Sequence, residues 1–305
     1  MVAILALYAL FGSTFILGKE AVSFVPPIFF IGIRMVLASL FLLLFIKLYQ
    51  KHSLKIKRED APWFAGIILF HIYVSYVFEF VGLQYLSGAK TSLLFNLSPF
   101  VTALFSYFFF KEVMTPRKWI GLLIGFCAFL PSLLSQTPGT ENTLGSIGFI
   151  SYPELFLIIS VISASAGWIF MRKLTRERGY TYFFVNTIGM LGGGILALLT
   201  SLYVEQWPQI IPLMNNIPFL RSLFLLILIG NVICFNLYGK LLATYSATIL
   251  SFFGFITPLF SALFGWFWLG ETVNWSFYVT VILVAFGLYE FYKEELRQGY
   301  INHKL

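Results

Sequence analysis

The sequence predicts an all-α integral membrane protein whose ten transmembrane helices form two inverted five-helix repeats. Composition is the first observation: 59% of the 305 residues are hydrophobic, 11% are charged, and the mean hydropathy is +0.87. These values lie outside the range of soluble globular proteins. The second observation is a series of apolar stretches of about 20 residues, each long enough to cross a hydrocarbon core of roughly 30 Å as a helix. The third is an internal repeat that relates the two halves of the chain.

Apolar runs between charged or Pro/Asn-containing segments define ten expected spans. The first five are 2–18, 27–47, 62–86, 91–110 and 117–135. The second five are 152–172, 180–204, 219–240, 246–269 and 273–293, which leaves 136–151 and 205–218 as sizeable loops. The runs are too long and alternate too little for the strands of a membrane barrel, which favours a helical bundle. We expect the first span to be a retained helix rather than a signal peptide, because no basic segment precedes it.

Basic residues in the short loops predict the orientation of the chain. They concentrate after spans two, four and six, at Lys47, Lys51, Lys55, Lys57, Arg58, Lys111, Arg117, Lys118, Arg172, Lys173, Arg176 and Arg178. Both termini are therefore expected in the cytoplasm, with the protein in the inner membrane. The net charge of +7 is mostly a signal of this topology, with some attraction to anionic lipid, so a nucleic-acid partner is not expected.

The internal repeat has an offset of 159 residues, the separation of Pro99 and Pro258. At the same offset Ser92 falls on Ser251, and Glu112 falls on Glu271. Because each copy holds five spans, an odd number, the second copy must cross the membrane in the opposite sense. Inverted repeats are typical of secondary transporters, in which the solute site lies near the midplane and access alternates between the two sides.

This division places the first five-helix repeat at 1–135 and an outer connecting loop at 136–151. The second repeat follows at 152–293, and a cytoplasmic tail at 294–305. Pro99 and Pro258 interrupt equivalent spans, where proline frees backbone carbonyls and kinks a helix. We interpret both prolines as hinge positions, with simple helix curvature as the alternative.

Several segments carry a family resemblance. The opening LFGSTFILGKEA, followed by PPIFFIGIRMVLA, is similar to a W-G-S-x-F and R-F pattern with Phe11 in place of the tryptophan. The segments GLQYLSGAKTSLLFNLSPFVTALFSYFFFKE and YSATILSFFGFITPLFSALFGWFWLGE add two hallmark regions. Together these motifs resemble the ten-helix EamA-type branch of the drug/metabolite transporter superfamily. The resemblance implies alternating access around a central cavity. The superfamily carries amino acids, nucleotide sugars, sugar phosphates and other metabolites, so the fold does not name the solute.

Glu79 is the expected centre of the solute site, because it is the acidic residue farthest from the ends of its span. An intramembrane carboxylate is a functional-site hypothesis by default. It could hold a positive charge of the solute, carry a coupling proton, or serve as a buried structural group. Tyr76 and Tyr73 precede it on the same span, and Tyr76 shares its face. His71 lies eight residues earlier, about 12 Å along a helix, so the two cannot grip one small group.

Other candidate solute contacts are polar or aromatic side chains within apolar spans: Asn96, Asn186, Asn231, Asn236, Arg34, Trp168 and Tyr8. Buried amides need hydrogen-bond partners, and a midplane cavity supplies some. Arg34 matches the arginine of the family resemblance and either faces an anionic group or extends towards the membrane surface. Repeat symmetry favours Trp168 and Tyr8 as cavity-lining residues.

The sequence therefore predicts a secondary transporter for a small polar solute. A lone carboxylate among aromatic residues favours a cationic or zwitterionic solute, such as an amino acid or S-adenosylmethionine. The run from Gln84 to Phe110 resembles the branch of the family found in metabolite-importing intracellular bacteria, which favours the S-adenosyl compound. A carrier of nucleotide sugars or other anionic metabolites is the alternative.

Other classes are less well supported by the residues. The chain contains no H-E-x-x-H or Cys/His cluster and no phosphate-binding G-x-x-x-x-G-K-[ST] loop, so no metal or cofactor is expected. An intramembrane enzyme would need a nucleophile with a base, or paired acids, at one depth. A channel or scramblase with the same helices stays open as an alternative. Ten helices suffice for a cavity, so a monomer or a homodimer fits equally well.

Overall fold

A computed structural model of the chain describes residues 2–49, 55–110, 113–128, 131, 145–147, 150–207, 213, 215–244, 250 and 253–297. These residues are mostly helical, as predicted. Seven helices are long and apolar enough to cross a membrane: Ala3–Ala21, Pro27–Leu48, Arg58–Leu83, Gly88–Phe109, Tyr152–Glu177, Tyr182–Val204 and Ile217–Leu241. Gly254–Leu269 and Trp275–Gly287 are shorter apolar helical stretches. The prediction of a multi-span helical membrane protein is confirmed.

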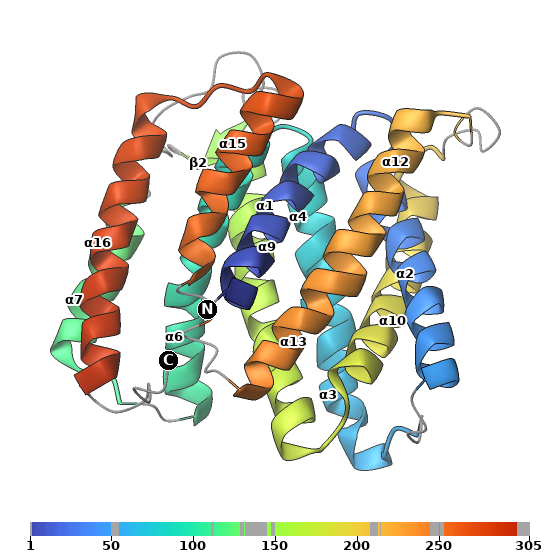
Figure 1. The fold of residues 1–305 in the computed structure, drawn as a ribbon, viewed down its shortest axis with the longest axis horizontal. Helices are drawn as coiled ribbons and strands as arrows, with labels where there is room; N and C mark the ends of the chain where they lie inside the picture. Colours follow the sequence, from blue (N-terminus) through green and yellow to red (C-terminus); the bar gives the residue numbers. More distant parts are fainter. Residues whose placement is uncertain are drawn as a thin grey trace.

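The first half of the chain begins with two long helices and continues through broken ones (Figure 1). Its α-helices are α1 (Val2–Ala21), α2 (Pro27–Tyr49), α3 (Ala61–Gly66), α4 (Ser75–Leu83), α5 (Gly88–Leu94), α6 (Ser98–Phe110) and α7 (Pro116–Cys127). A 3₁₀ turn, η1 (Arg58–Asp60), precedes α3, and π-helix η2 (Ile67–Val74) joins α3 to α4. A second 3₁₀ turn, η3 (Phe95–Leu97), joins α5 to α6.

The second half has the same kinds of elements. Its α-helices are α9 (Tyr152–Arg172), α10 (Tyr182–Val204), α12 (Ile217–Leu225), α13 (Phe235–Thr244), α15 (Thr257–Leu269) and α16 (Trp275–Arg297). Two π-helices, η5 (Lys173–Glu177) and η6 (Leu226–Cys234), and one 3₁₀ turn, η7 (Gly254–Ile256), interrupt or extend them. Within the expected loop 136–151, the short strands β1 (Ser146–Ile147) and β2 (Ile150–Ser151) pair antiparallel.

Several expected boundaries shift or fall partly outside the described residues. The span expected at 62–86 is one continuous helix of three pieces, α3, η2 and α4. The span expected at 117–135 is described as α7 to Cys127, and the start of 246–269 lies mostly outside the described residues. Helix α16 extends to Arg297, past the expected end at 293, and 298–305 of the expected tail lie outside the described residues.

Local sequence explains where the helices of the second half begin and end. Ser151 and Glu154 form a capping box at the start of α9, in which the Ser151 backbone N–H donates to Glu154 Oε2 at 2.7 Å. Thr181 caps α10 and Asn216 caps α12, each accepting from a backbone N–H of the first turn. Gly270 ends α15 in the left-handed region, with φ of 67°.

The irregular turns of the two halves coincide at the repeat offset. The π-helices η2 and η6 begin at Ile67 and Leu226, which are 159 residues apart. The 3₁₀ turns η3 and η7, and the helices α6 and α15 that follow them, have the same separation. Departures from α-helix are uncommon and often mark functional sites. Their recurrence indicates that the repeat extends from sequence to backbone geometry.

The predicted hinge residues lie at these breaks. Pro99 and Pro258 stand in the first turn of α6 and α15, directly after η3 and η7. Proline is tolerated in a first turn because its missing N–H would have had no partner there. The interruption of each span is therefore the 3₁₀ turn before the proline rather than a kink after it, and hinge motion at these positions stays a prediction.

Repeat-related helices pair with one another at the two flanks of the bundle (Figure 1). Helices α2 and α10 run antiparallel, because Glu205 at the end of α10 accepts from the N–H groups of Ile28 and Phe29 at the start of α2, at 2.9 and 2.7 Å. Helices α7 and α16 are also antiparallel, with Arg117 3.7 Å from Glu294. Helix α1 lies between these flanks and contacts α15, η6 and α5.

Glycines let the neighbouring helices approach η2 closely. A Cβ at Gly167 of α9 would lie 2.5 Å from His71 Cβ, and one at Gly193 of α10 would lie 2.5 Å from Ile72 Cγ2. Small residues of this kind are the usual means of tight helix packing in membranes. The π-helical segment is thereby held on two sides, which fixes the residues that follow it on α4.

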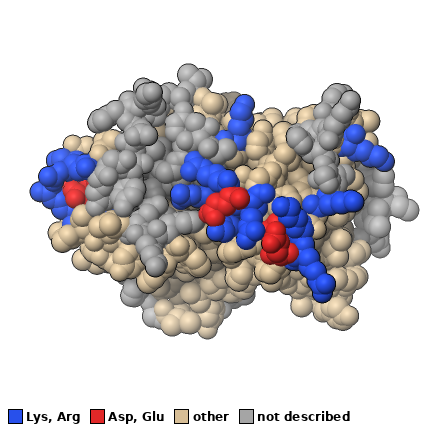
Figure 2. All heavy atoms as spheres, turned by 90° about the horizontal axis from the view of Figure 1, so that it is seen from below, with Lys and Arg blue, Asp and Glu red and all other residues tan. Residues whose placement is uncertain are grey.

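The two ends of the bundle differ in charge. Figure 2 shows Lys and Arg gathered over the end seen from below, where the expected cytoplasmic loops join their helices. Arg178 lies 3.3 Å from Asp60 at this end. At the opposite end, Lys19 donates to the carbonyls of Leu83 and Gln84 at 2.8 Å each. Other polar contacts at that end join Lys90 to Glu154, Arg221 to Glu20, and Gly88 to Glu271.

Candidate functional site

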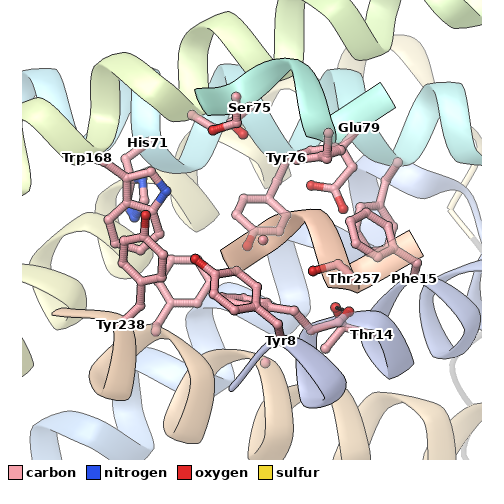
Figure 3. Close-up of a pocket in the computed structure, with 18 of the residues that line it drawn as sticks. Tyr8, Thr14, Phe15, His71, Ser75, Tyr76, Glu79, Trp168, Tyr238 and Thr257 are labelled. Atoms are coloured by element: carbon pink, nitrogen blue, oxygen red, sulfur yellow. Dashed lines mark hydrogen bonds between the residues drawn. The ribbon is translucent and has the colours of Figure 1, made fainter. Parts of the chain in front are cut away.

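A cavity lies in the middle of the bundle, between the broken helices of the two halves (Figure 3). Helix α1, the segments η2–α4 and η6–α13, and helix α9 form most of its wall. Five repeat-related pairs face it: His71 and Gly230, Tyr76 and Phe235, Glu79 and Tyr238, Phe95 and Gly254, and Ser98 and Thr257. The pseudo-symmetric part of the fold therefore builds the cavity.

Glu79 presents an unpaired carboxylate to this cavity. Its side chain lies on α4, is 8% exposed, and points into the space between Tyr76 and Phe15 (Figure 3). No hydrogen bond or ion pair within 4.0 Å joins it to any other described residue. A buried charge is costly unless it is paired or hydrogen-bonded, so this carboxylate is available to a solute.

Arg34 of α2 supplies the opposite charge at the same end of the cavity. It is 3% exposed, and its guanidinium carbon lies 5.0 Å from the ring centre of Tyr76 and 4.9 Å from that of Phe80. These distances are typical of cation–π contacts. Arg34 forms no ion pair within 4.0 Å with a described residue, and its Nε has no hydrogen-bond partner among them. Its interaction with Glu79 is electrostatic and acts over a distance, without a direct contact between the two side chains.

The other end of the cavity is aromatic. Trp168 of α9 stacks on Tyr238 of α13, with ring centres 4.0 Å apart and an interplanar angle of 29°. His71 meets the Trp168 ring edge-on at 4.2 Å. Tyr8 of α1 donates its hydroxyl to the carbonyl of Leu250 beside this group. Figure 3 shows these rings on one side and Glu79 on the other, with Tyr76 between them.

Neutral polar groups complete the wall. Asn96 of η3 is 3% exposed, and its Nδ2 has no hydrogen-bond partner among the described residues. Ser98 lies 3.3 Å from Ser165, measured between the two hydroxyl oxygens. Thr257 faces the cavity from the start of α15 (Figure 3). An unsatisfied buried amide next to a cavity is a further group that a polar solute can contact.

The structure divides the predicted site residues into two sets. The first set lines the cavity and comprises Glu79, Tyr76, Arg34, Asn96, Trp168 and Tyr8. The second set lies outside the lining and comprises Tyr73, Asn186, Asn231 and Asn236. Tyr73 bonds Thr200 at 2.6 Å between their hydroxyl oxygens. The three asparagines pack inside the second half.

Those asparagines are engaged with their neighbours. Asn186 Nδ2 donates to Asn236 Oδ1 at 3.0 Å, and Asn236 Nδ2 donates to the Val232 carbonyl at 2.8 Å. Asn231 Nδ2 lies 3.0 Å from the sulfur of Met35. These contacts tie η6 and α13 to α10 and α2. The described geometry therefore gives Asn186 and Asn236 a part in holding the second half together and Asn231 a part in joining it to the first.

Sequence reasoning missed the aromatic residues of the second half that face the cavity, above all Tyr238 and Phe235. The repeat offset contains the signal for both, since they occupy the positions equivalent to Glu79 and Tyr76. His71 was set aside because it is too far from Glu79 to share one group. The structure brings both residues to the same cavity, at its two ends.

The charged cavity residues do not resemble a metal centre. Among the described residues, no group of three or more His, Cys, Asp or Glu side chains is placed to hold a metal ion. The two described cysteines, Cys127 and Cys234, are unpaired and lie on different helices.

Comparison with known proteins decides the family. A model of the EamA-like transporter family matches residues 1–133 and 151–292. The chain belongs to the EamA-like transporter family. The predicted family is confirmed, and so is the prediction of a membrane transporter, because the relatives of this chain are named transporters.

Relatives from several bacteria match nearly the whole chain. A Chlamydia muridarum protein named S-adenosylmethionine/S-adenosylhomocysteine transporter is 35% identical over 96% of this chain and 91% of its own length. A Chlamydia trachomatis protein of the same name is 35% identical over 96% of this chain and 88% of its own. An uncharacterized Bacillus subtilis transporter is 27% identical over 92% of this chain and 87% of its own length. A crystal structure with 17% identity and a TM-score of 0.70 covers 97% of both chains, which supports the fold.

Proposed function

We propose that this protein is a secondary carrier that moves S-adenosylmethionine and S-adenosylhomocysteine across the inner membrane by alternating access. The observation that carries the proposal is the mid-bundle cavity in which Glu79 and Arg34, neither in an ion pair with a described residue, lie opposite a cluster of aromatic rings. Both compounds combine an amino acid with an adenine ring. A cavity with both charges and stacking surfaces suits such a solute better than it suits a simple ion.

The named chlamydial relatives support the choice of solute, since they match this chain over nearly its full length. Fold alone would not, because one transporter fold carries many solutes. Arg34 favours a second candidate, an anionic metabolite such as a nucleotide sugar. Glu79 in the same cavity would repel an anion, and its lack of a described partner argues against that alternative.

We also infer ten spans in two inverted repeats, with both termini in the cytoplasm. The coincidence of η2 with η6, and of α6 with α15, at one offset supports the repeat. The antiparallel pairing of α2 with α10 supports the inversion, since two copies with the same orientation would pair in parallel. The basic end in Figure 2 supports a cytoplasmic placement of that end.

Counterflow in proteoliposomes tests the function. Vesicles preloaded with unlabelled S-adenosylhomocysteine should accumulate labelled S-adenosylmethionine with saturable kinetics. Glu79→Gln keeps the shape of the side chain and removes its charge, so we expect it to lower exchange by about 100-fold or more, the cost of an unpaired buried charge partner. Glu290→Gln makes the same chemical change on α16, outside the cavity lining, and should exchange like the wild type.

Each of the other classes predicts a different result. Exchange of nucleotide sugars in place of S-adenosyl compounds would favour the anionic carrier. Flux that neither saturates nor shows counterflow would indicate a channel or scramblase. Conversion of a labelled lipid or peptide by the purified protein, lost in Glu79→Gln, would indicate an intramembrane enzyme. Normal exchange in Glu79→Gln would leave a carrier whose site does not use this carboxylate.

A further inference from the structure

The two ends of the cavity offer different chemistry, and each end comes from particular helices. Arg34 of α2 and Glu79 of α4 form the charged end. Trp168 of α9, Tyr238 of α13 and His71 of η2 form the aromatic end. His71 and Glu79 are eight residues apart along one continuous helix, which corresponds to about 12 Å at 1.5 Å per residue. A solute that contacts both ends must therefore be elongated.

The charged end matches an α-amino acid group. Glu79 and Arg34 are both more than nine-tenths buried, carry opposite charges, and do not touch each other within 4.0 Å. The guanidinium carbon lies within about 6 Å of the ring centres of Phe30, Tyr76 and Phe80, and these rings restrict the orientation of its planar fork. A guanidinium binds a carboxylate through two parallel hydrogen bonds, and a carboxylate accepts from an ammonium. A zwitterionic α-amino acid supplies both partners at once.

The aromatic end matches a flat, uncharged ring. Trp168 and Tyr238 stack, and His71 closes one side against Trp168. No Asp, Glu, Lys or Arg belongs to this end among the described lining residues. Stacking on aromatic side chains is how proteins hold bases without reading their edges. A purine fits this end, whereas an anionic or sugar-only group gains little from it.

We propose that Arg34 binds the α-carboxylate of the solute and Glu79 its α-ammonium, while the Trp168–Tyr238–His71 cluster holds its adenine ring. This assignment rests on the proposed function and deepens it. Between the two ends, the described wall presents the rings of Tyr76 and Phe235, 5.8 Å apart, rather than a second carboxylate. The sulfur of the solute therefore meets neutral surface, whether it is a sulfonium or a thioether.

One consequence concerns the two natural solutes. S-adenosylmethionine and S-adenosylhomocysteine share the amino acid and the adenosine and differ at the sulfur. Because the described cavity has no dedicated counter-charge for a sulfonium, we expect their dissociation constants to agree within about tenfold, the range that weak cation–π contacts allow. A carrier with this property can exchange one compound for the other. Methionine and methylthioadenosine, which each occupy one end, should bind much more weakly than either.

The experiment pairs each cavity variant with a solute that lacks the group in question. Binding to purified protein in nanodiscs is measured by calorimetry for S-adenosylhomocysteine, S-adenosylmethionine, decarboxylated S-adenosylmethionine and methylthioadenosine. Arg34→Met should weaken S-adenosylmethionine by roughly 30-fold or more, as for other truncated buried charge pairs. It should change the affinity for the decarboxylated compound by less than about threefold, since that solute has no carboxylate to lose. Arg34→Lys, which keeps the charge without the fork, should fall between.

The complementary variants complete the assignment. Glu79→Gln should weaken the decarboxylated compound, which keeps its ammonium, but should leave methylthioadenosine within about threefold of the wild type. Trp168→Leu should weaken every adenine-containing solute, methylthioadenosine included, by about tenfold, the value of one stacked ring. A variant is compared with the wild type only if it is monodisperse and its melting temperature is unchanged.

Three results would overturn the proposal in different ways. If the wild type binds S-adenosyl compounds and Arg34→Met weakens the decarboxylated compound as much as the parent, Arg34 does not read the carboxylate and the assignment is wrong. If methylthioadenosine binds as tightly as S-adenosylhomocysteine, the charged end does not take the amino acid. If well-folded wild type binds neither S-adenosyl compound, the proposed function is wrong, and the assignment of the two ends, which rests on it, is wrong as well.

Discussion

The two π-helical spans that face the cavity, η2–α4 in the first half and η6–α13 in the second, share a backbone pattern and differ in chemistry. Three equivalent pairs line the cavity from them: His71 and Gly230, Tyr76 and Phe235, and Glu79 and Tyr238. The first span contributes a carboxylate and an imidazole. The second contributes rings and a glycine, and its amides bond Asn186 of the same half and the sulfur of Met35 on α2.

This difference separates two requirements of a carrier. Alternating access needs both halves to bend alike, because each must open and close in turn. The paired π-helices and 3₁₀ turns give both halves the same breaks in the backbone. Solute recognition needs an asymmetric set of groups, because the proposed solute has an amino acid at one end and a purine at the other. The side chains at equivalent positions have diverged accordingly, whereas the breaks in the backbone have not.

The largest effect we expect comes from disturbing the support of the first span. A Cβ at Gly167 would lie 2.5 Å from His71 Cβ and 2.6 Å from its Cα, so the backbone of η2 would have to move. At Gly230, the position equivalent to His71, the nearest atom to a new Cβ is Thr14 Cγ2 at 3.5 Å. Gly167→Ala should therefore lower the free energy of unfolding by about 1–3 kcal/mol, as overpacking usually does.

Gly230→Ala is the matched control for that substitution. It adds the same methyl group to η6 itself, where the nearest atom is 3.5 Å away, and should change stability by less than about 1 kcal/mol. Thermal unfolding in detergent measures both variants. Equal losses of stability in the two would mean that the two spans are supported in the same way. Wild-type stability in Gly167→Ala would show that α9 and η2 do not approach as closely as described.

The sequence predicted much of the fold for identifiable physical reasons. Apolar length gave the helical membrane class, and the spacing of Pro99 and Pro258 gave the repeat offset that η3 and η7 share. The π-helices were not predicted, because η2 and η6 read as ordinary apolar helix. Helix η2 packs against glycines of α9 and α10, a contact that no local pattern reveals.

The site was predicted in part for a related reason. A lone acidic residue in an apolar span is expensive, which singled out Glu79. Burying an asparagine also costs free energy. Asn186 and Asn236 offset part of that cost by hydrogen-bonding each other at 3.0 Å, and only the fold reveals this pairing. A tyrosine in an apolar span does not have a comparable free-energy cost of burial, so Tyr238 did not stand out in the sequence. One aromatic residue among many gives no signal until it is aligned with Glu79 at the repeat offset.

A second, smaller effect tests the structural part of the comparison. Asn236→Leu removes the acceptor of Asn186 Nδ2 and leaves that buried donor unpaired. We expect a loss of about 1–3 kcal/mol in unfolding free energy, the cost of one unsatisfied buried group. The ratio of KM values for S-adenosylmethionine and S-adenosylhomocysteine should stay unchanged, because neither asparagine lines the described cavity.

A double-mutant cycle provides the control for this pair. In Asn186→Leu/Asn236→Leu both partners are replaced, so the combined loss should be smaller than the sum of the two single losses. Additive losses would mean that the bond between them contributes little. A changed ratio of KM values would instead assign these amides to the solute, as the sequence alone suggested.

The smallest effect lies at the end of the ninth expected span, where the repeat places Glu271 opposite Glu112 of the first half. Glu112 lies outside the described residues. Glu271 accepts from the Gly88 backbone N–H at 3.4 Å, near Lys19. Burial raises the pKa of this carboxyl above its ordinary value of 4.5, and the N–H groups of Gly88 and Ala89 and the charge of Lys19 offset only part of that increase.

A raised pKa in the folded state means that the folded protein holds this proton more tightly than the unfolded chain. The stabilisation is full below the ordinary pKa of 4.5 and is lost as pH rises through the raised pKa. Glu271→Gln cannot ionise and does not lose this stabilisation. As pH rises from 4.5 through the raised pKa, the melting temperature of the variant should therefore increase relative to that of the wild type, by a few degrees at most. Glu290→Gln gives the baseline for a Glu-to-Gln change elsewhere. If the melting temperature of Glu271→Gln does not rise relative to that of the wild type as pH rises, burial does not raise the pKa of Glu271 in the folded protein.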